Sequence, residues 1–135
     1  MIRRWFKTRG TSMAEAAITL PVLVLLTFAM INLTLAGYAA VAASNAANYG
    51  ARIGAVAQEN SIAYATAAAQ ERVDAIGIGS FTVTASGGGS RGSQVIVLVD
   101  WAVPNYLGSL LSWLGGSDAL SFSGTAQSAF RQEGW

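Results

Sequence analysis

The sequence lacks both cysteine and histidine among its 135 residues. Without cysteine there is no disulfide, no thiol nucleophile and no zinc site of the cysteine type. Without histidine the chain lacks the commonest general base and the commonest ligand of transition metals. We therefore expect no catalytic residue, no metal site and no cofactor, and we do not expect an enzyme.

Charged residues are also scarce, at 11% of the chain, whereas an ordinary globular protein has about 25%. A formal net charge of +1 argues against a basic nucleic-acid binder, and an apolar fraction of 53% excludes a charged disordered tail. The charges are unevenly distributed. No charged residue lies between residues 16 and 51, whereas the first ten residues carry no acid and four bases, Arg3, Arg4, Lys7 and Arg9.

Residues 16–38 form an apolar segment within this uncharged stretch. The hydrocarbon core of a bilayer is about 30 Å thick and is crossed by about 20 helical residues, so this segment is long enough to span it. The basic residues in front predict a cytoplasmic N-terminus, with the rest of the chain outside. A buried core helix is the first alternative, but it would need apolar cover on every face. A secretory signal peptide is the second, but its apolar region is only about 7–15 residues long.

The apolar segment continues into an alanine-rich stretch, and together they predict one long helix over residues 11–58. Pro21 lacks a backbone N–H and is expected to bend this helix near its first turns. Gly37, Gly50 and Gly54 are either weak points of the helix or positions of close packing against a neighbouring helix.

Residues 59–135 are predicted to form a small α+β domain outside the membrane. A helix over residues 61–77 would begin at an Asn60 or Ser61 cap and end at Gly77. Its apolar face would carry Ile62, Ala65, Ala69, Val73 and Ile76. Alternation predicts strands over residues 80–86 and 93–103, joined by the flexible turn GGGSRG, and a third strand over residues 119–130. The buried face of the second strand would carry Val95, Val97, Val99, Trp101 and Val103. A helix over residues 105–116 would precede the third strand. The expected fold is thus a long transmembrane helix, a short amphipathic helix and a three-stranded antiparallel sheet, which is pilin-like in outline.

Two features of this region resemble parts of a phosphate-binding site or an active site, but each lacks the further residues that such a site needs. The GGGSRG turn lacks the Gly-Lys-Ser/Thr ending of a phosphate-binding loop. Asp100 follows a run of strand residues, but no second acid, base or nucleophile accompanies it. Three of the four tryptophans lie in this region, and they are Trp101, Trp113 and Trp135. They are either lipid-facing anchors or core and subunit contacts.

The junction between the basic segment and the apolar segment carries a distinctive motif. The basic segment ends at Gly10, Glu15 follows, and after it come Ala16-Ala17 and then Leu20-Pro21 before VLVLL. This order resembles the prepilin signal of type IV pilins and pseudopilins. It is most similar to the opening of TadE-like proteins, the pseudopilins of the tight adherence (Tad, or Flp-type) pilus system. The resemblance covers residues 3–57, although many members have an aromatic residue where this chain has Ala16.

The resemblance implies that residues 1–10 are a leader removed by a prepilin peptidase between Gly10 and Thr11. Thr11 would then be the N-methylated first residue and Glu15 the fifth. The carboxylate of Glu15 could pair with the α-amino group of the next subunit, which would set the axial register and offset the desolvation of both charges. Alternatively, Glu15 is an ordinary first-turn acid favoured by the helix dipole, and both interpretations can hold together.

The resemblance therefore implies a minor pilin or pseudopilin of Tad-type pilus assembly, a structural subunit in the bacterial cytoplasmic membrane and, if it enters the filament, in the pilus itself. Its partners would be membrane lipid, the prepilin peptidase, other pilin or pseudopilin subunits and the assembly platform. The major-pilin alternative is disfavoured because Flp-type major pilins are much shorter. An unprocessed, single-pass membrane-anchored binding domain is the main alternative, and a membrane-tethered enzyme is the third.

Overall fold

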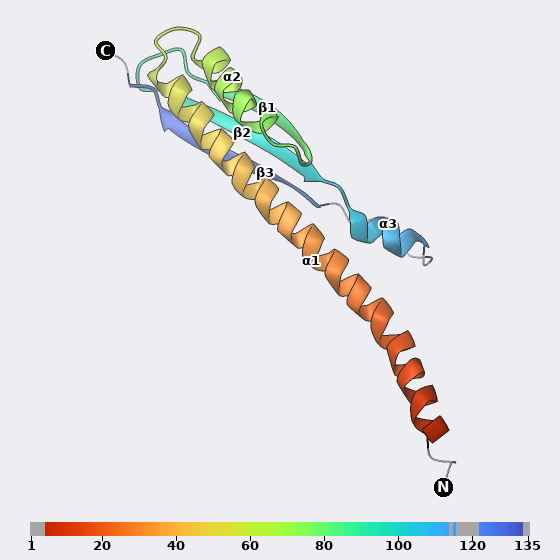
Figure 1. Cartoon of the computed structure of the whole chain (residues 1–135). Coiled ribbons are helices and arrows are strands. Elements are labelled where there is room, and N and C mark those ends of the chain that lie inside the picture. Colours follow the sequence, from red (N-terminus) through yellow and green to blue (C-terminus); the bar gives the residue numbers. More distant parts are fainter. Residues whose placement is uncertain (1–4, 114, 116–121, 134–135) are drawn as a thin grey trace.

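The computed structural model describes residues 5–113, 115 and 122–133. In these residues the three strands form one antiparallel sheet in the order β1-β2-β3, and Figure 1 shows that α1 extends far beyond it. This arrangement confirms the predicted α+β fold. The elements in chain order are α1 (Trp5–Val56), α2 (Ser61–Asp74), β1 (Ser80–Gly87), β2 (Gln94–Val103), α3 (Tyr106–Trp113) and β3 (Phe122–Arg131).

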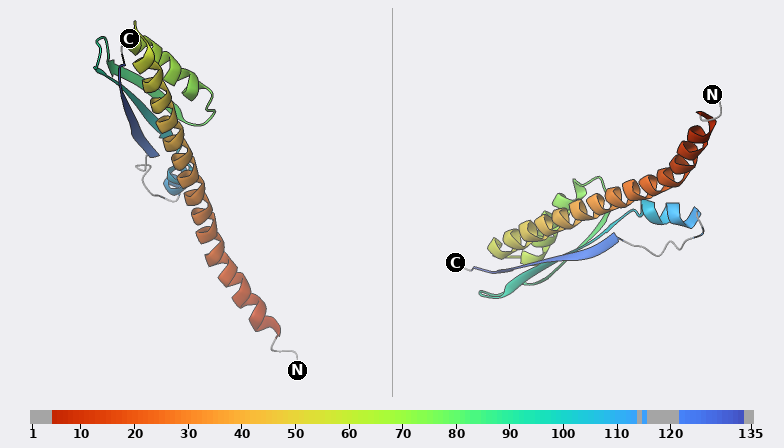
Figure 2. Two further views of the ribbon diagram at one scale, coloured as in Figure 1. Left: turned by 90° about the vertical axis from the view of Figure 1, so that its left-hand side faces the viewer. Right: turned by 90° about the horizontal axis from the view of Figure 1, so that it is seen from below.

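Helix α1 begins at Trp5 and therefore extends into the basic segment, ahead of the expected start at residue 11. The sequence WFKTR contains no helix breaker, and a single glycine such as Gly10 lowers helix stability by only about 1 kcal/mol relative to alanine. The helix is continuous through Pro21. Figure 2 shows that α1 curves in its N-terminal part.

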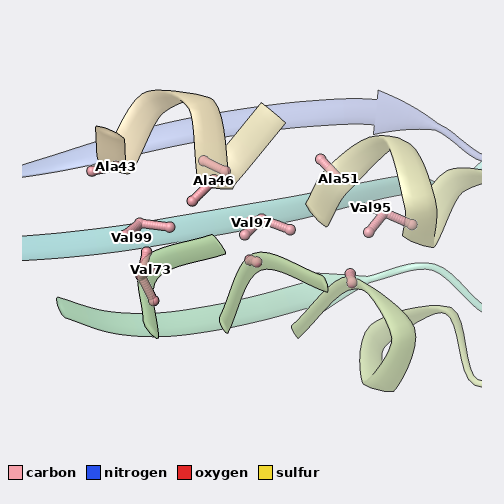
Figure 3. Packing of buried hydrophobic residues seen from close by; sticks show 10 residues of the cluster. Ala43, Ala46, Ala51, Val73, Val95, Val97 and Val99 are labelled. Carbon is pink, nitrogen blue, oxygen red and sulfur yellow. The ribbon is translucent and has the colours of Figure 1, made fainter. Parts of the chain in front are cut away.

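One face of the sheet is buried under α1 and α2. The predicted inward face of β2 is confirmed, because Val95, Val97 and Val99 are fully buried and Val103 is nearly so. Figure 3 shows Val95, Val97 and Val99 lying against the side chains of the two helices. The helix residues of this core are Ala43, Ala46, Ala47 and Ala51 from α1, and Ala65, Ala69 and Val73 from α2.

Two helical glycines of α1 are positions of close packing. A Cβ atom added to Gly50 would lie 2.6 Å from the main-chain oxygen of Ala65, and one added to Gly54 would lie 2.7 Å from the Cβ of Ala65. Gly37 differs from both, since an added Cβ there would meet no atom within 4 Å. The alternatives left open by the sequence are thus resolved, with α2 of the same chain as the neighbouring helix.

Helix α2 differs from its prediction at both ends. Asn60 precedes the helix in a left-handed conformation, with φ of 52°, and its side chain makes no capping hydrogen bond. The helix ends at Asp74, before Gly77, because Ala75 closes it with an ordinary right-handed conformation. The buried face includes Ala65, Ala69 and Val73 as predicted. Ile62, however, is 41% exposed, and Ser61 is buried in its place.

Strands β1 and β2 form the expected hairpin, with Ser80 opposite Ala102 and Gly87 opposite Val95. A hydrogen bond closes the connecting turn, in which the amide of Gly88 donates to the carbonyl of Gln94 at 2.9 Å. Left-handed φ values, which cost glycine little, occur at Gly87, Gly88, Gly89 and Gly92.

The C-terminal elements are shorter or shifted relative to the predictions. Helix α3 covers Tyr106–Trp113, and the remainder of the predicted helix at residues 114 and 116 lies outside the described residues. Strand β3 runs Phe122–Arg131, one residue beyond the predicted end, while residues 119–121 of the prediction lie outside the described residues.

Side-chain hydrogen bonds fasten β3 and the residue after it to the C-terminal half of α1 and the residue that follows this helix. The hydroxyl of Ser128 donates to Oδ1 of Asn48 at 2.7 Å, and Nε2 of Gln132 donates to the carbonyl of Ala57 at 2.9 Å. Together with the alanine core, these contacts place the sheet against the part of α1 that follows residue 36.

Candidate functional site

The sequence-predicted processing residues lie in the N-terminal part of α1. Gly10 and Thr11 are both helical, so the peptide bond between them is in the interior of the helix that begins at Trp5. Cleavage of this bond would require the surrounding helical turn to open. Gly10 makes such opening easier, since glycine in a helix interior is about 1 kcal/mol less favourable than alanine.

Glu15 is exposed on the same helix, and its main-chain carbonyl accepts a hydrogen bond from the Thr19 hydroxyl at 2.8 Å. The first turn of α1 contains no acidic residue. Because the effect of the helix dipole is confined to the first turn, it does not account for Glu15 in the full chain. Thr11 and Glu15 are four residues apart on one helix and therefore lie on the same face.

The segment after Glu15 is an apolar surface that the rest of the chain leaves uncovered (Figure 1). Among the described residues, α1 is the single helix long and apolar enough to cross a membrane. Only 6% of its most apolar 18 residues are buried. The core-helix alternative is therefore wrong, because a core helix would be covered on its apolar faces. The helix fits a single-pass membrane anchor. Its large exposed side chains include Ile18, Leu20, Val22, Leu23, Leu26 and Met30.

From residue 11 onward, the first buried residue of α1 is Asn32, and Leu25, Phe28 and Ala29 before it are half-buried. Asn32 and Ala39 are fully buried and Ala36 is 9% exposed, although Leu33, on another face of the helix, is 70% exposed. The predicted span of residues 16–38 thus includes several residues packed against the α+β region. Residues 16–36 rise about 30 Å at about 1.5 Å per residue, so a bilayer that begins after Glu15 ends within about one helical turn of Asn32.

Asn32 contacts the start of α3, and sequence reasoning missed this contact. Its Oδ1 accepts a hydrogen bond from the amide of Tyr106 at 3.2 Å, and its Nδ2 donates to Oδ1 of Asn105 at 3.2 Å. The same Asn105 oxygen accepts the amide of Gly108 at 2.8 Å and thereby caps α3. The available signal was an amide side chain between Ile31 and Leu33, because such a group is costly to bury without a partner.

The outward face of the sheet is mostly polar, although Ile96 and Leu98 of β2 lie on it half-buried. A shallow depression on it is lined in part by Thr82, Asp100 and Thr125, and the Thr125 hydroxyl donates to the Asp100 carboxylate. Trp101 instead packs partly buried on the core side, close against Gly124. Trp135 lies outside the described residues. Within the described ranges, no group of three His, Cys, Asp or Glu side chains could hold a metal ion.

The N-terminal part of the chain, which contains most of these residues, is similar to a known protein family. Residues 10–52 match the family described as TadE-like protein. The match begins at Gly10 and covers Glu15, Pro21 and Asn32, while the sheet lies outside it. It confirms the resemblance drawn from the sequence motif. Comparisons with curated proteins and with solved structures gave no match.

Proposed function

From this TadE-like N-terminal region, we propose that the chain is a minor pilin or pseudopilin, a membrane-anchored structural subunit of Tad-type pilus assembly that is processed after Gly10. One observation carries the proposal. The segment that matches the TadE-like family is a helix whose first part exposes large apolar side chains and whose second part is packed on a small α+β region.

The proposed topology follows from charge. The leader carries four basic residues and no acid, whereas the chain after residue 15 carries its charges only from Arg52 onward. Basic residues next to a span are retained in the cytoplasm, so the N-terminus is cytoplasmic and the sheet is extracytoplasmic. The subunit is then held in the cytoplasmic membrane before it takes part in assembly.

The proposed processing step is hydrolysis of the Gly10–Thr11 bond by a prepilin peptidase. It frees the α-amino group of Thr11 four residues before the Glu15 carboxylate. In an assembly, the carboxylate of one subunit pairs with the amino terminus of the next, and the pairing offsets the cost of placing two charges near lipid. Processing also brings Glu15 close to a helix N-terminus, where the helix dipole stabilises an acid.

The proposed subunit catalyses no reaction of its own. It is a substrate of the peptidase at one bond, and otherwise it acts by packing against lipid, other pilin or pseudopilin subunits and the assembly platform. A second candidate function is an unprocessed membrane-anchored binding domain. The observation that favours it is the helical conformation of the Gly10–Thr11 bond, which a peptidase would first have to unwind.

The intact mass and N-terminal sequence of the protein from native membranes distinguish these two functions. A chain that begins at Thr11, with or without a methyl group, supports the pilin proposal. A chain that begins at Met1 contradicts it and leaves the unprocessed anchor. A chain that begins near residue 44 would mean signal-peptide cleavage and would contradict both.

A matched pair of variants sharpens this experiment. Gly10→Leu places a large side chain next to the scissile bond, and we expect this variant to keep its leader. Gly37→Ala changes a glycine of the same helix at a position with no neighbouring atom within 4 Å, and we expect normal processing. Processing of Gly10→Leu at the wild-type rate would show that the cut lies elsewhere.

A further inference from the structure

We propose that α3 is a membrane-contacting helix that lies in the headgroup region of the outer leaflet, next to the point where α1 leaves the bilayer. This inference rests on the proposed insertion of α1 in a membrane. It adds a second lipid contact, so that the α+β region lies on the membrane surface.

The position of α3 along α1 is the first argument. The amide of Tyr106 and the side chain of Asn105 both bond to Asn32, so α3 begins beside that residue. A bilayer that encloses the uncovered apolar segment from about residue 16 ends within about one helical turn of residue 32, because about 20 helical residues cross its core. Figure 1 shows α3 lying alongside α1 at the end of the sheet that faces the uncovered segment.

The composition of α3 is the second argument. Its sequence, YLGSLLSW, contains no charged residue and is apolar except for its two serines. Tyr106, at its start, is 47% exposed. Tyrosine and tryptophan are enriched at the membrane–water interface, where their rings reach apolar groups and their polar atoms reach water. A short, neutral helix with an aromatic residue at each end suits this layer better than open solvent.

The hydrogen bonds of the exposed hydroxyl groups are the third argument. Ser109 donates to the carbonyl of Asn105 at 3.2 Å, and Ser112 donates to that of Ser109 at 2.9 Å. In the uncovered part of α1, Thr19 and Thr27 likewise donate to carbonyls four residues earlier, each at 2.8 Å. Hydroxyls bonded to their own helix need no water, so they can face lipid at little cost.

Asn32 links the two lipid contacts. Its side chain is fully buried, and both of its polar atoms bond to the start of α3. If α3 moved away, this amide would be left at the edge of the hydrocarbon without partners, which is unfavourable. Insertion of α1 therefore favours the docked position of α3 and holds it at the depth of Asn32.

Depth-dependent fluorescence quenching tests this inference. The chain has no cysteine, so single-cysteine variants accept one label each. Three exposed positions suffice, with an environment-sensitive fluorophore on Ser109→Cys in α3, Leu23→Cys in the uncovered segment and Glu59→Cys at the far end. The full chain is reconstituted in vesicles of phosphatidylcholine and phosphatidylglycerol at three to one. Nitroxide quenchers are placed either near the headgroup or near the end of the acyl chain.

We expect the Ser109 label to lose more emission to the shallow quencher than to the deep one, and the Leu23 label to show the reverse. The Glu59 label should keep its emission with both. Quenching at Leu23 without quenching at Ser109 would overturn the inference and leave the membrane anchor intact. Absence of quenching at Leu23 would instead contradict the anchor itself. Loss of Ser109 quenching as the protein-to-lipid ratio rises would assign this face to a second copy of the chain and would also overturn the inference.

Discussion

The two halves of α1 form one continuous helix but differ in the size of their side chains. Before residue 32 the helix presents leucine, isoleucine, valine and methionine, and these side chains are mostly exposed. From residue 36 onward its inward face consists almost entirely of alanine and glycine, and these residues are buried. Large side chains therefore occur where no other element of the chain packs, and small ones occur where α2 and the sheet pack closely.

The difference shows how one helix is adapted to two environments. An alanine face buries little apolar area of its own, and large side chains in its place would hold α2 and the sheet farther away. Its contribution is to let α2 and the sheet come close, so that Val95, Val97 and Val99 are fully enclosed. The uncovered half keeps its large apolar area available for contact with lipid.

The largest expected effect comes from placing a charge in the uncovered half. Leu23→Asp should disfavour membrane insertion by about 3 kcal/mol, the cost of a charged side chain at the centre of a span. The α+β region should unfold at an unchanged temperature in detergent, because Leu23 contacts none of its core. Membrane fractionation after alkaline extraction and thermal unfolding measure the two effects. Ser44→Asp, at an exposed position of the covered half, is the control and should remain in the membrane.

The next effect comes from adding one methyl group to the covered half. Gly50→Ala should lower the free energy of unfolding by about 2 kcal/mol, because overpacking of a tight contact forces the backbone to move. Gly37→Ala adds the same methyl group in open space and should raise helix stability by up to about 1 kcal/mol. Denaturant unfolding in detergent compares the two variants. Equal effects of the two substitutions would contradict the close contact between α1 and α2.

A smaller effect is expected at the boundary between the halves. Asn32→Ala removes a partner of the Tyr106 amide and of the Asn105 side chain. The free energy that holds the start of α3 on α1 should fall by about 1.5 kcal/mol. Hydrogen exchange at the Tyr106 amide should accelerate by the corresponding factor. Asn45→Ala, at an exposed asparagine of the same helix, should leave this exchange rate unchanged. Unchanged exchange in Asn32→Ala would show that α3 is held by other contacts.

The smallest effect is expected at the tie between β3 and α1. Ser128→Ala removes the 2.7 Å hydrogen bond to Asn48 and should lower the free energy of unfolding by about 1 kcal/mol. Ser123→Ala, on the exposed face of the same strand, should have no measurable effect. Chemical unfolding compares the two variants. If Ser128→Ala leaves the free energy of unfolding unchanged, the bond between Ser128 and Asn48 does not help to hold the sheet on α1.

Features with a strong local signal could be predicted from the sequence. The apolar run, the alternation of Val95, Val97 and Val99, and the glycine-rich turn each follow from neighbouring residues alone. The motif from Gly10 to Pro21 likewise indicated the resemblance to TadE-like proteins, which the match over residues 10–52 bears out. These signals depend on periodicity and order, which are present in one sequence.

Features that depend on tertiary contact could not be predicted. Whether Gly50 or Gly37 is a contact position depends on where α2 lies, and both look alike in the sequence. The burial of Ser61 in place of Ile62 depends on the same packing. Asn32 pairs with residues 73 and 74 positions away, and nothing near it in the sequence identifies these partners.

The most direct test of the difference between the two halves is labelling of single cysteines in intact cells with a membrane-impermeant maleimide applied from outside. We predict that Ser44→Cys is labelled and that Leu26→Cys is labelled only after the membrane is dissolved. Both positions are exposed in the isolated chain, so lipid is the difference that the experiment detects. Equal labelling of both positions in intact cells would contradict a helix whose first half is in lipid and whose second half is in protein.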